Sequence, residues 1–93
     1  MLFITTYKVK PYITKAETAE LMEVFAKQGS APGEIAHYVN ADGGGGGGVV
    51  ISDTADMAGS YRNNLNYAEW LEFDTTLVLT VDQAVPHILD AIA

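Results

Sequence analysis

The sequence predicts an α+β domain of the ferredoxin-like class, ordered strand-helix-strand-strand-helix-strand with a further helix at the C-terminal end. Two observations carry this prediction. Stretches with helical periodicity and stretches with strand alternation follow one another along the 93 residues. A run of six glycines, residues 43–48, also lies between two strand-like stretches, as the tip of a hairpin would. One strand and helix before the hairpin, and one helix and strand after it, predict a four-stranded antiparallel sheet in the order 4-1-3-2.

Composition narrows the classes of function. Twelve acidic residues face five scattered basic ones, a net charge of −7, which argues against a nucleic-acid or anionic membrane partner. The chain has no cysteine, and therefore no disulfide or thiolate chemistry. It shows neither a basic-then-apolar leader nor a long apolar run, so we expect a cytoplasmic protein, with residues 1–93 as one domain.

The first half of the chain contains a strand, a helix and a second strand. The strand over residues 2–10 is apolar on both faces, with Leu2 and Ile4 on one and Phe3, Tyr7 and Val9 on the other. The helix over residues 15–28 begins at a capping box, with Thr14 as N-cap and Glu17 three positions later, and Gly29 ends it. After a turn at Pro32 and Gly33, alternation predicts a strand over residues 35–40.

The second half repeats the pattern after the glycine run. A short strand over residues 49–52 leads to a helix capped by Asp53 or Thr54. The apolar stripe of that helix consists of Met57, Ala58, Tyr61 and Leu65. A strand over residues 71–80 has the clearest alternation in the chain, and its acids Glu72 and Asp74 suit an exposed edge better than a tuned acid-base pair. The last helix, residues 83–92, takes Asp82 as its cap.

A second copy of the chain is the expected macromolecular partner. A ferredoxin-like domain leaves one sheet face without helices, and the first strand is apolar on that face too. The hydrophobic content of 48% exceeds what one small core needs. These observations predict a homodimer that pairs the open faces by twofold symmetry.

Short motifs spread over nearly the whole chain resemble a known group of proteins. They are Met1-Leu2-Phe3 with Thr6-Tyr7, the Pro32-Gly33 turn, Ala41-Asp42-Gly43 with its glycine-rich exit, and Trp70-Leu71-Glu72-Phe73-Asp74 leading into Leu77-Val78-Leu79. On these motifs the chain resembles the dimeric α/β-barrel superfamily. Within it, the chain is most similar to a small bacterial family described only as a domain of unknown function.

The resemblance implies a fold and several classes of activity. Two ferredoxin-like subunits of this superfamily pack their open sheet faces into one barrel. Its members include cofactor-free monooxygenases, isomerases, haem-degrading enzymes and haem peroxidases. Haem degradation there uses an asparagine in the first strand and a histidine on a helix after a tryptophan, whereas here the first strand contains no asparagine and the second helix contains no histidine. Fold analogy does not choose among the other classes.

The glycine run carries no recognisable nucleotide motif. No Lys-Ser or Lys-Thr follows it, and it leads into a strand rather than a helix. A tolerated hairpin tip is the interpretation we favour over an anion site. If a strand begins within the run, the missing side chains leave space above the sheet, which a ligand or an aromatic residue such as Trp70 would fill.

Five residues are candidates for a ligand pocket between sheet and helices: Tyr7, His37, Tyr38, Asn40 and Trp70. Aromatic groups suit a flat hydrophobic ligand, but they also suit a core and a dimer interface. His37 is a potential general base or metal ligand, yet a core-edge histidine is the commoner case. The only other histidine, His87, lies fifty positions away, so no metal site is predicted. No catalytic residue is assigned.

Alternation puts His37 and Tyr38 on opposite faces of their strand. The more apolar neighbours of His37 place it against the helices, and Tyr38 then faces the barrel, with Asn40 near its mouth. On this basis Tyr38 is expected to touch any ligand. A buried, hydrogen-bonded His37 would cost about 1–3 kcal/mol of stability when replaced by alanine.

The sequence leaves two classes of function open. In the first, the dimer binds a small hydrophobic or aromatic molecule, as a binding protein or as a cofactor-independent monooxygenase or isomerase, with no cofactor. In the second, it is a non-enzymatic dimerisation or interaction module, and the aromatic residues only pack. A cavity favours the first class and a filled core the second.

Overall fold

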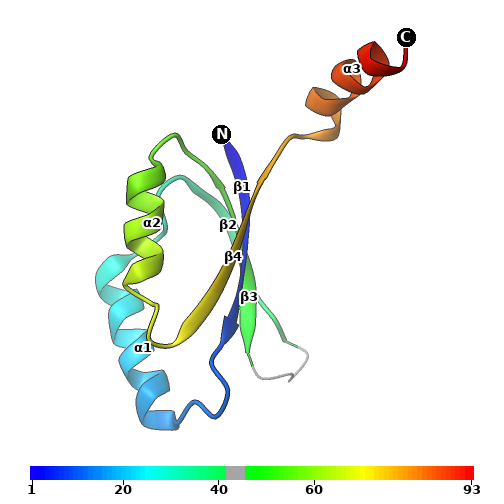
Figure 1. The fold of residues 1–93 in the computed structure, drawn as a ribbon. Coiled ribbons are helices and arrows are strands. Elements are labelled where there is room, and N and C mark those ends of the chain that lie inside the picture. The colour runs from blue at the N-terminus through cyan, green and yellow to red at the C-terminus, as the bar shows by residue number, and fades with distance from the viewer. Residues whose placement is uncertain (42–45) are drawn as a thin grey trace.

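A four-stranded sheet with two helices against one face forms the body of the protein (Figure 1). The computed structural model describes residues 1–41 and 46–93, so residues 42–45 of the expected hairpin tip lie outside it. In chain order the elements are β1 (Leu2–Val9), α1 (Lys15–Gln28), β2 (Glu34–Val39), β3 (Gly47–Asp53), α2 (Met57–Leu65), β4 (Leu71–Val78) and α3 (Val81–Ile92). This is the predicted α+β order, including the C-terminal helix.

The strands lie in the order β2-β3-β1-β4, and each neighbouring pair is antiparallel. Counted from the opposite edge, this is the order 4-1-3-2. β1 is therefore an inner strand, and β4 is an edge strand whose Glu72 and Asp74 are exposed. Glu72 lies directly opposite Lys8 in the register, a favourable pairing of opposite charges at the sheet edge.

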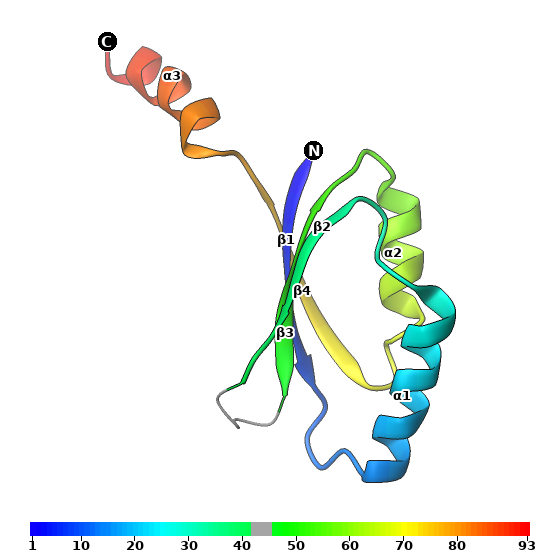
Figure 2. The same cartoon turned by 180° about the vertical axis from the view of Figure 1, so that it is seen from behind.

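α1 and α2 lie side by side on one face of the sheet, and the other face has no helix over it (Figures 1 and 2). The described part of the chain buries few large side chains, chiefly Phe3, Tyr67 and Trp70. Many others are exposed, including Ile4 and Tyr38 on the open sheet face. The monomer therefore leaves much of its apolar surface in water.

The helix caps explain where the helices begin. α1 has the predicted bounds and the predicted capping box between Thr14 and Glu17. α2 begins later than expected because its N-cap is Asp56, whose carboxylate accepts from the Gly59 backbone N–H at 2.9 Å, so the assignment to Asp53 or Thr54 was wrong.

α3 also begins at a different cap from the one expected. Thr80 is the N-cap rather than Asp82, because Thr80 and Gln83 form a complete capping box. The Gln83 backbone N–H donates to the Thr80 hydroxyl at 3.1 Å, and the Gln83 side chain accepts from the Thr80 N–H at 2.9 Å. The helix therefore begins at Val81, two residues earlier than predicted, and β4 ends correspondingly early, at Val78.

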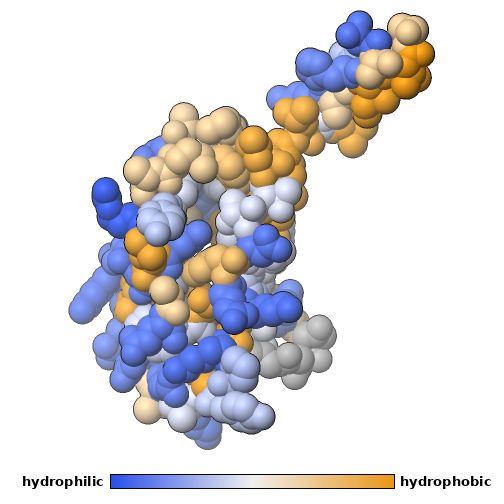
Figure 3. Space-filling view, viewed as in Figure 1, coloured by the Kyte–Doolittle hydropathy of each residue, from blue (hydrophilic) through white to orange (hydrophobic). Residues whose placement is uncertain are grey.

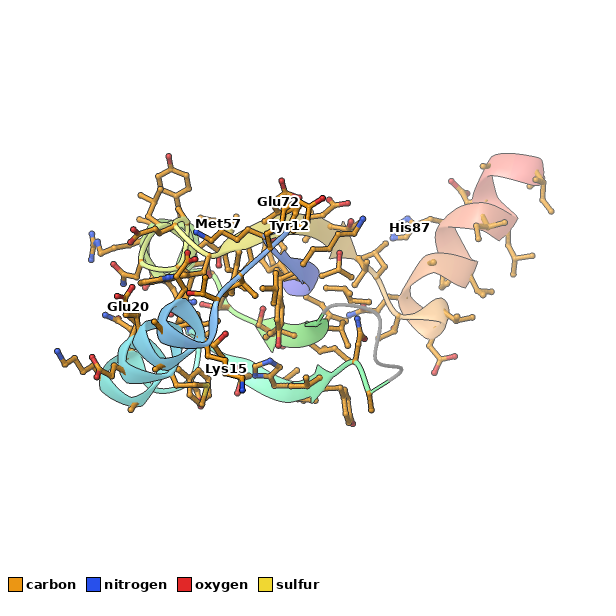
Figure 4. All side chains as sticks on the ribbon, turned by 90° about the horizontal axis from the view of Figure 1, so that it is seen from below. Tyr12, Lys15, Glu20, Met57, Glu72 and His87 are labelled. Carbon is orange, nitrogen blue, oxygen red and sulfur yellow. The ribbon has the colours of Figure 1, made fainter. Side chains whose placement is uncertain are left out.

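α3 extends away from the body, on the side of the sheet opposite α1 and α2 (Figures 1 and 2). Figure 3 shows hydrophobic residues gathered along one side of this helix and hydrophilic residues along another. Seen from below, the helix that carries His87 stands clear of the rest of the molecule (Figure 4). No helix of residues 1–41 and 46–93 is long and apolar enough to span a membrane.

Candidate functional site

A cavity of about 530 Å³ lies between the sheet and helices α1 and α2. Side chains from both layers line it, most of them apolar or aromatic: Phe3, Val9, Leu21, Phe25, Val50, Tyr61, Leu71 and Phe73. The volume falls within the roughly 300–1,000 Å³ typical of small-molecule sites. The two layers are thus held apart by a lined space rather than joined by a filled core.

Aromatic rings follow one another across the sheet side of this cavity. Tyr67 lies 6.5 Å from Phe73, and Phe73 lies 6.2 Å from Tyr7, measured between ring centroids. The row continues with Tyr7 and His37 at 5.5 Å, then His37 and Phe25 at 6.2 Å. Most of these pairs meet edge to face, a favoured geometry for aromatic rings. The row connects β4, β1, β2 and α1 into one aromatic wall.

The polar centre of that wall is a hydrogen bond between Tyr7 and His37. The Tyr7 hydroxyl oxygen lies 2.6 Å from Nε2 of His37. Tyr7 is on β1, His37 is on β2, and β3 runs between these two strands. The two side chains together therefore bridge two strand spacings, about 9.6 Å of sheet. A side chain on β3 at this point would block it.

Gly48 of β3 makes that reach possible. It lies opposite Tyr7 in the register, and the Tyr7 ring lies over it. A Cβ added at Gly48 would come within 2.5 Å of the Tyr7 hydroxyl oxygen and 2.3 Å of the Tyr38 carbonyl oxygen. Of the two occupants considered for the space above the glycines, a ligand or an aromatic residue such as Trp70, the structure has an aromatic residue at Gly48, and it is Tyr7. The last glycines of the run therefore position the site.

Glu34 is the third member of a polar group formed with Tyr7 and His37, and it is a residue that the sequence did not indicate. One of its carboxylate oxygens lies 3.8 Å from Nδ1 of His37, on the far side of the ring from Tyr7. Strict alternation would put residues 34 and 37 on opposite faces of β2. A register shift between Glu34 and Ala36 places both on the cavity side. The sequence carries no local signal for this irregularity.

The surroundings raise the pKa of two phenols in this region. Burial raises the pKa of Tyr7 above its usual value, and the negative charge of Glu34 adds to the effect. The pKa of Tyr67 is raised in the same way, by burial first and by Glu34 second. Both hydroxyls therefore keep their protons more firmly than a phenol in water.

The raised pKa of Tyr7 predicts a loss of stability in alkali. The folded protein holds this proton more tightly than the unfolded chain, so the contribution is complete below the ordinary value of 10.0 and is lost as pH rises through the folded-state pKa. We expect Tyr7→Phe to weaken the fall in unfolding free energy between about pH 8 and pH 11. Urea unfolding of both proteins at the two pH values measures this change in unfolding free energy.

The control for that measurement is Tyr12→Phe, because Tyr12 is almost fully exposed. It should reproduce the wild-type pH dependence. Tyr67 remains in both variants, so part of the alkaline effect persists in each. An equal loss of stability in Tyr7→Phe and in the wild type would contradict the assignment.

The structure brings together two of the five residues expected at the pocket. Tyr7 and His37 line the cavity, and the prediction that His37 faces the helices is confirmed. Tyr38 lies on the open face and is 62% exposed, on the other side of the sheet from the cavity. The expectation that Tyr38 meets the ligand assumed a site on that open face.

The other two candidates lie away from the cavity wall. Asn40 follows β2, and its backbone N–H donates to Gly47 at 2.9 Å. Trp70 precedes β4 and is only 7% exposed, and its indole N–H has no hydrogen-bond partner among residues 1–41 and 46–93. Neither side chain lines the cavity. In the same ranges, no three histidine or acidic side chains cluster as metal ligands.

Fold and site together define an α+β protein of ferredoxin-like type with an aromatic cavity between sheet and helices. A family model described as a domain of unknown function, DUF3303, matches residues 1–92. The chain belongs to this family, and the resemblance to a domain-of-unknown-function family is confirmed. A search of curated proteins found no match.

Proposed function

We propose that the protein binds a small, flat, mainly apolar molecule in the cavity between the sheet and helices α1 and α2. The observation that carries this proposal is a cavity of about 530 Å³ walled by aromatic rings, with one polar group, Tyr7–His37, set into the wall. Small-molecule sites combine these features: a mostly apolar lining and a few polar atoms that fix the ligand's orientation.

The energetics of an empty cavity support the same proposal. Apolar side chains that face empty space lack van der Waals partners on that side, and those that face water remain unburied. A ligand that restores the missing contacts therefore stabilises the folded state.

The enzymatic form of this proposal is a cofactor-independent isomerase or monooxygenase. The specific observation in its favour is the short Tyr7–His37 hydrogen bond with Glu34 beyond the ring. Such a chain can take up or supply one proton next to a bound substrate, which general acid-base catalysis requires. Binding is the part of the function that both forms share.

Filling the cavity tests the proposal. We expect naphthalene, used as a flat apolar probe, to bind the wild-type protein saturably at one site per chain. Ser60 on α2 lines the cavity, so Ser60→Trp should weaken this binding by at least about tenfold, because the indole occupies the ligand's space. Isothermal titration calorimetry measures both affinities.

A matched variant separates filling from a general effect of tryptophan. Glu20 on α1 is exposed and does not line the cavity, so Glu20→Trp should leave naphthalene binding unchanged. Absence of binding to the wild type, or an equal loss in both variants, would overturn the proposal.

We also propose that the protein is a homodimer in which α3 of each chain covers the open sheet face of the other. The large apolar side chains of α3 are exposed within the described part of their own chain, and α3 extends on the side of that open face (Figures 2 and 3). The face carries Leu2, Ile4 and Ile51 on neighbouring strands. Twofold symmetry lets one such contact be made twice. This contact is also what favours the second candidate function, a dimerisation module.

A further inference from the structure

We propose that the cavity selects ligands that carry a hydroxyl group or another hydrogen-bond donor on the apolar body, and that the Tyr7 oxygen accepts this hydrogen bond. The inference rests on the proposed binding function and adds the chemical class of the ligand. It follows from which of the two residues, Tyr7 or His37, donates the proton of their hydrogen bond.

The neighbours of His37 decide which ring nitrogen carries the proton. The Glu34 carboxylate lies 3.8 Å from Nδ1, and a negative charge there favours a proton on Nδ1. In the tautomer with the proton on Nδ1, Nε2 has no proton and accepts. Its partner at 2.6 Å is the Tyr7 hydroxyl, which is the donor in this arrangement.

The Tyr7 hydroxyl has one proton, which it donates to Nε2 of His37. Burial and Glu34 both keep the phenol protonated, so this proton stays between oxygen and nitrogen. What Tyr7 offers to the cavity is a lone pair on its oxygen. A ligand hydroxyl or N–H completes the hydrogen bond, whereas a carbonyl or ether oxygen at the same place would face another acceptor.

Other polar side chains also line the cavity, among them Ser52, Ser60 and Tyr67, whose hydroxyls both donate and accept. The hydroxyls of Thr5 and Thr75 are 2.9 Å apart and hydrogen-bonded to each other. Asn63 and Asn64 on α2 carry amides that both donate and accept, so they do not discriminate between ligand classes. The Glu34 carboxylate on the sheet side of the cavity can only accept, so it favours the same class of ligand, and the Tyr7 oxygen is the acceptor that the variants below test.

The probes that test the inference differ only at one position of the same flat body. They are naphthalene, 1-naphthol and 1-methoxynaphthalene, with 1-acetonaphthone as the carbonyl compound. In a purely apolar cavity the hydroxyl would weaken binding, because it would lose its water and gain no partner. We expect instead that the wild type binds 1-naphthol about tenfold more tightly than 1-methoxynaphthalene.

Two variants identify the acceptor. The double substitution Tyr7→Phe with His37→Leu removes both polar atoms and keeps an apolar wall, a change that folded proteins tolerate well. It should reduce the preference for 1-naphthol to less than about twofold. His37→Leu alone frees the Tyr7 proton, so 1-acetonaphthone should bind at least about fivefold more tightly than it does to the wild type.

The outcomes distinguish this inference from the function on which it rests. If naphthalene binds the wild type but 1-naphthol binds no better than 1-methoxynaphthalene, the cavity is a binding site and the donor preference is wrong. A hydroxyl preference that survives in the double variant assigns the acceptor elsewhere and also overturns it. If none of the four probes binds, both proposals fail.

Discussion

For the proposed dimer, we expect the double substitution Ile88→Asp and Leu89→Asp to shift the mass in solution from about twice 10.0 kDa to the 10.0 kDa of a monomer. Both side chains lie on the apolar side of α3, and each is more than half exposed in the monomer. Two buried carboxylates without partners cost several kcal/mol, more than the interface can absorb. Light scattering coupled to size exclusion, at micromolar concentration, measures the mass.

The strength of the effect follows from how much apolar surface α3 holds. Its apolar side chains are Val81, Val85, Ile88, Leu89 and Ile92, with exposed fractions from 39% to 75%. Burying the exposed half of ten such side chains, five from each helix, yields roughly 8–15 kcal/mol. Association opposes it by roughly 4–15 kcal/mol. On these figures the two helices alone are near balance, so in the proposed dimer the open sheet face would have to supply the excess.

The control adds one such charge on the other side of the helix. His87 lies one position before Ile88 and outside the apolar stripe, so His87→Asp should remain dimeric. A wild-type protein that is monomeric at micromolar concentration contradicts the dimer proposal. A double variant that stays dimeric contradicts the role of α3 in it.

Gly48→Ala is expected to destabilise the protein by about 2–3 kcal/mol, which lowers the melting temperature by roughly 10–20 °C. The new methyl group meets the Tyr38 carbonyl oxygen at 2.3 Å and the Tyr7 hydroxyl oxygen at 2.5 Å. The backbone of β2 cannot move away without breaking the ladder with β3. Thermal unfolding followed by circular dichroism measures the change.

A control substitution at Gly29 distinguishes this steric clash from the ordinary effect of replacing a glycine. Gly29 has a φ of 69°, but a Cβ there meets nothing within 4 Å. Gly29→Ala should therefore cost only about 1 kcal/mol, from backbone strain. The Tyr7 contact also predicts that Gly48→Ala costs less in a Tyr7→Ala background, and an unchanged cost would contradict it.

Local signals explain why much of the fold could be predicted. α1 is bounded by a capping box at Thr14 and by Gly29, so both of its ends are marked in the sequence. The start of α3 was equally well marked, since Thr80 and Gln83 have capping-box spacing, but Asp82 offered a competing cap. β3 begins at Gly47, two residues earlier than predicted, because glycines carry no side-chain pattern.

The site depends on contacts that no local pattern records. Tyr7 and His37 meet only because β1, β3 and β2 are in one register with a glycine between them. Glu34 joins them through an irregularity in that register. Alternation was enough to place His37 on the helix side, but it could not show that the cavity lies there and not beside Tyr38.

A nitrogen-15 NMR titration with naphthalene locates the binding site and so tests whether a binding cavity lies between sheet and helices. We expect amide signals of cavity residues such as Thr5, Val50 and Phe73 to shift together and saturate, while those of Val85 and Ile92 on α3 stay unchanged. Shifts confined to α3, or no saturable shift in the body, would contradict it.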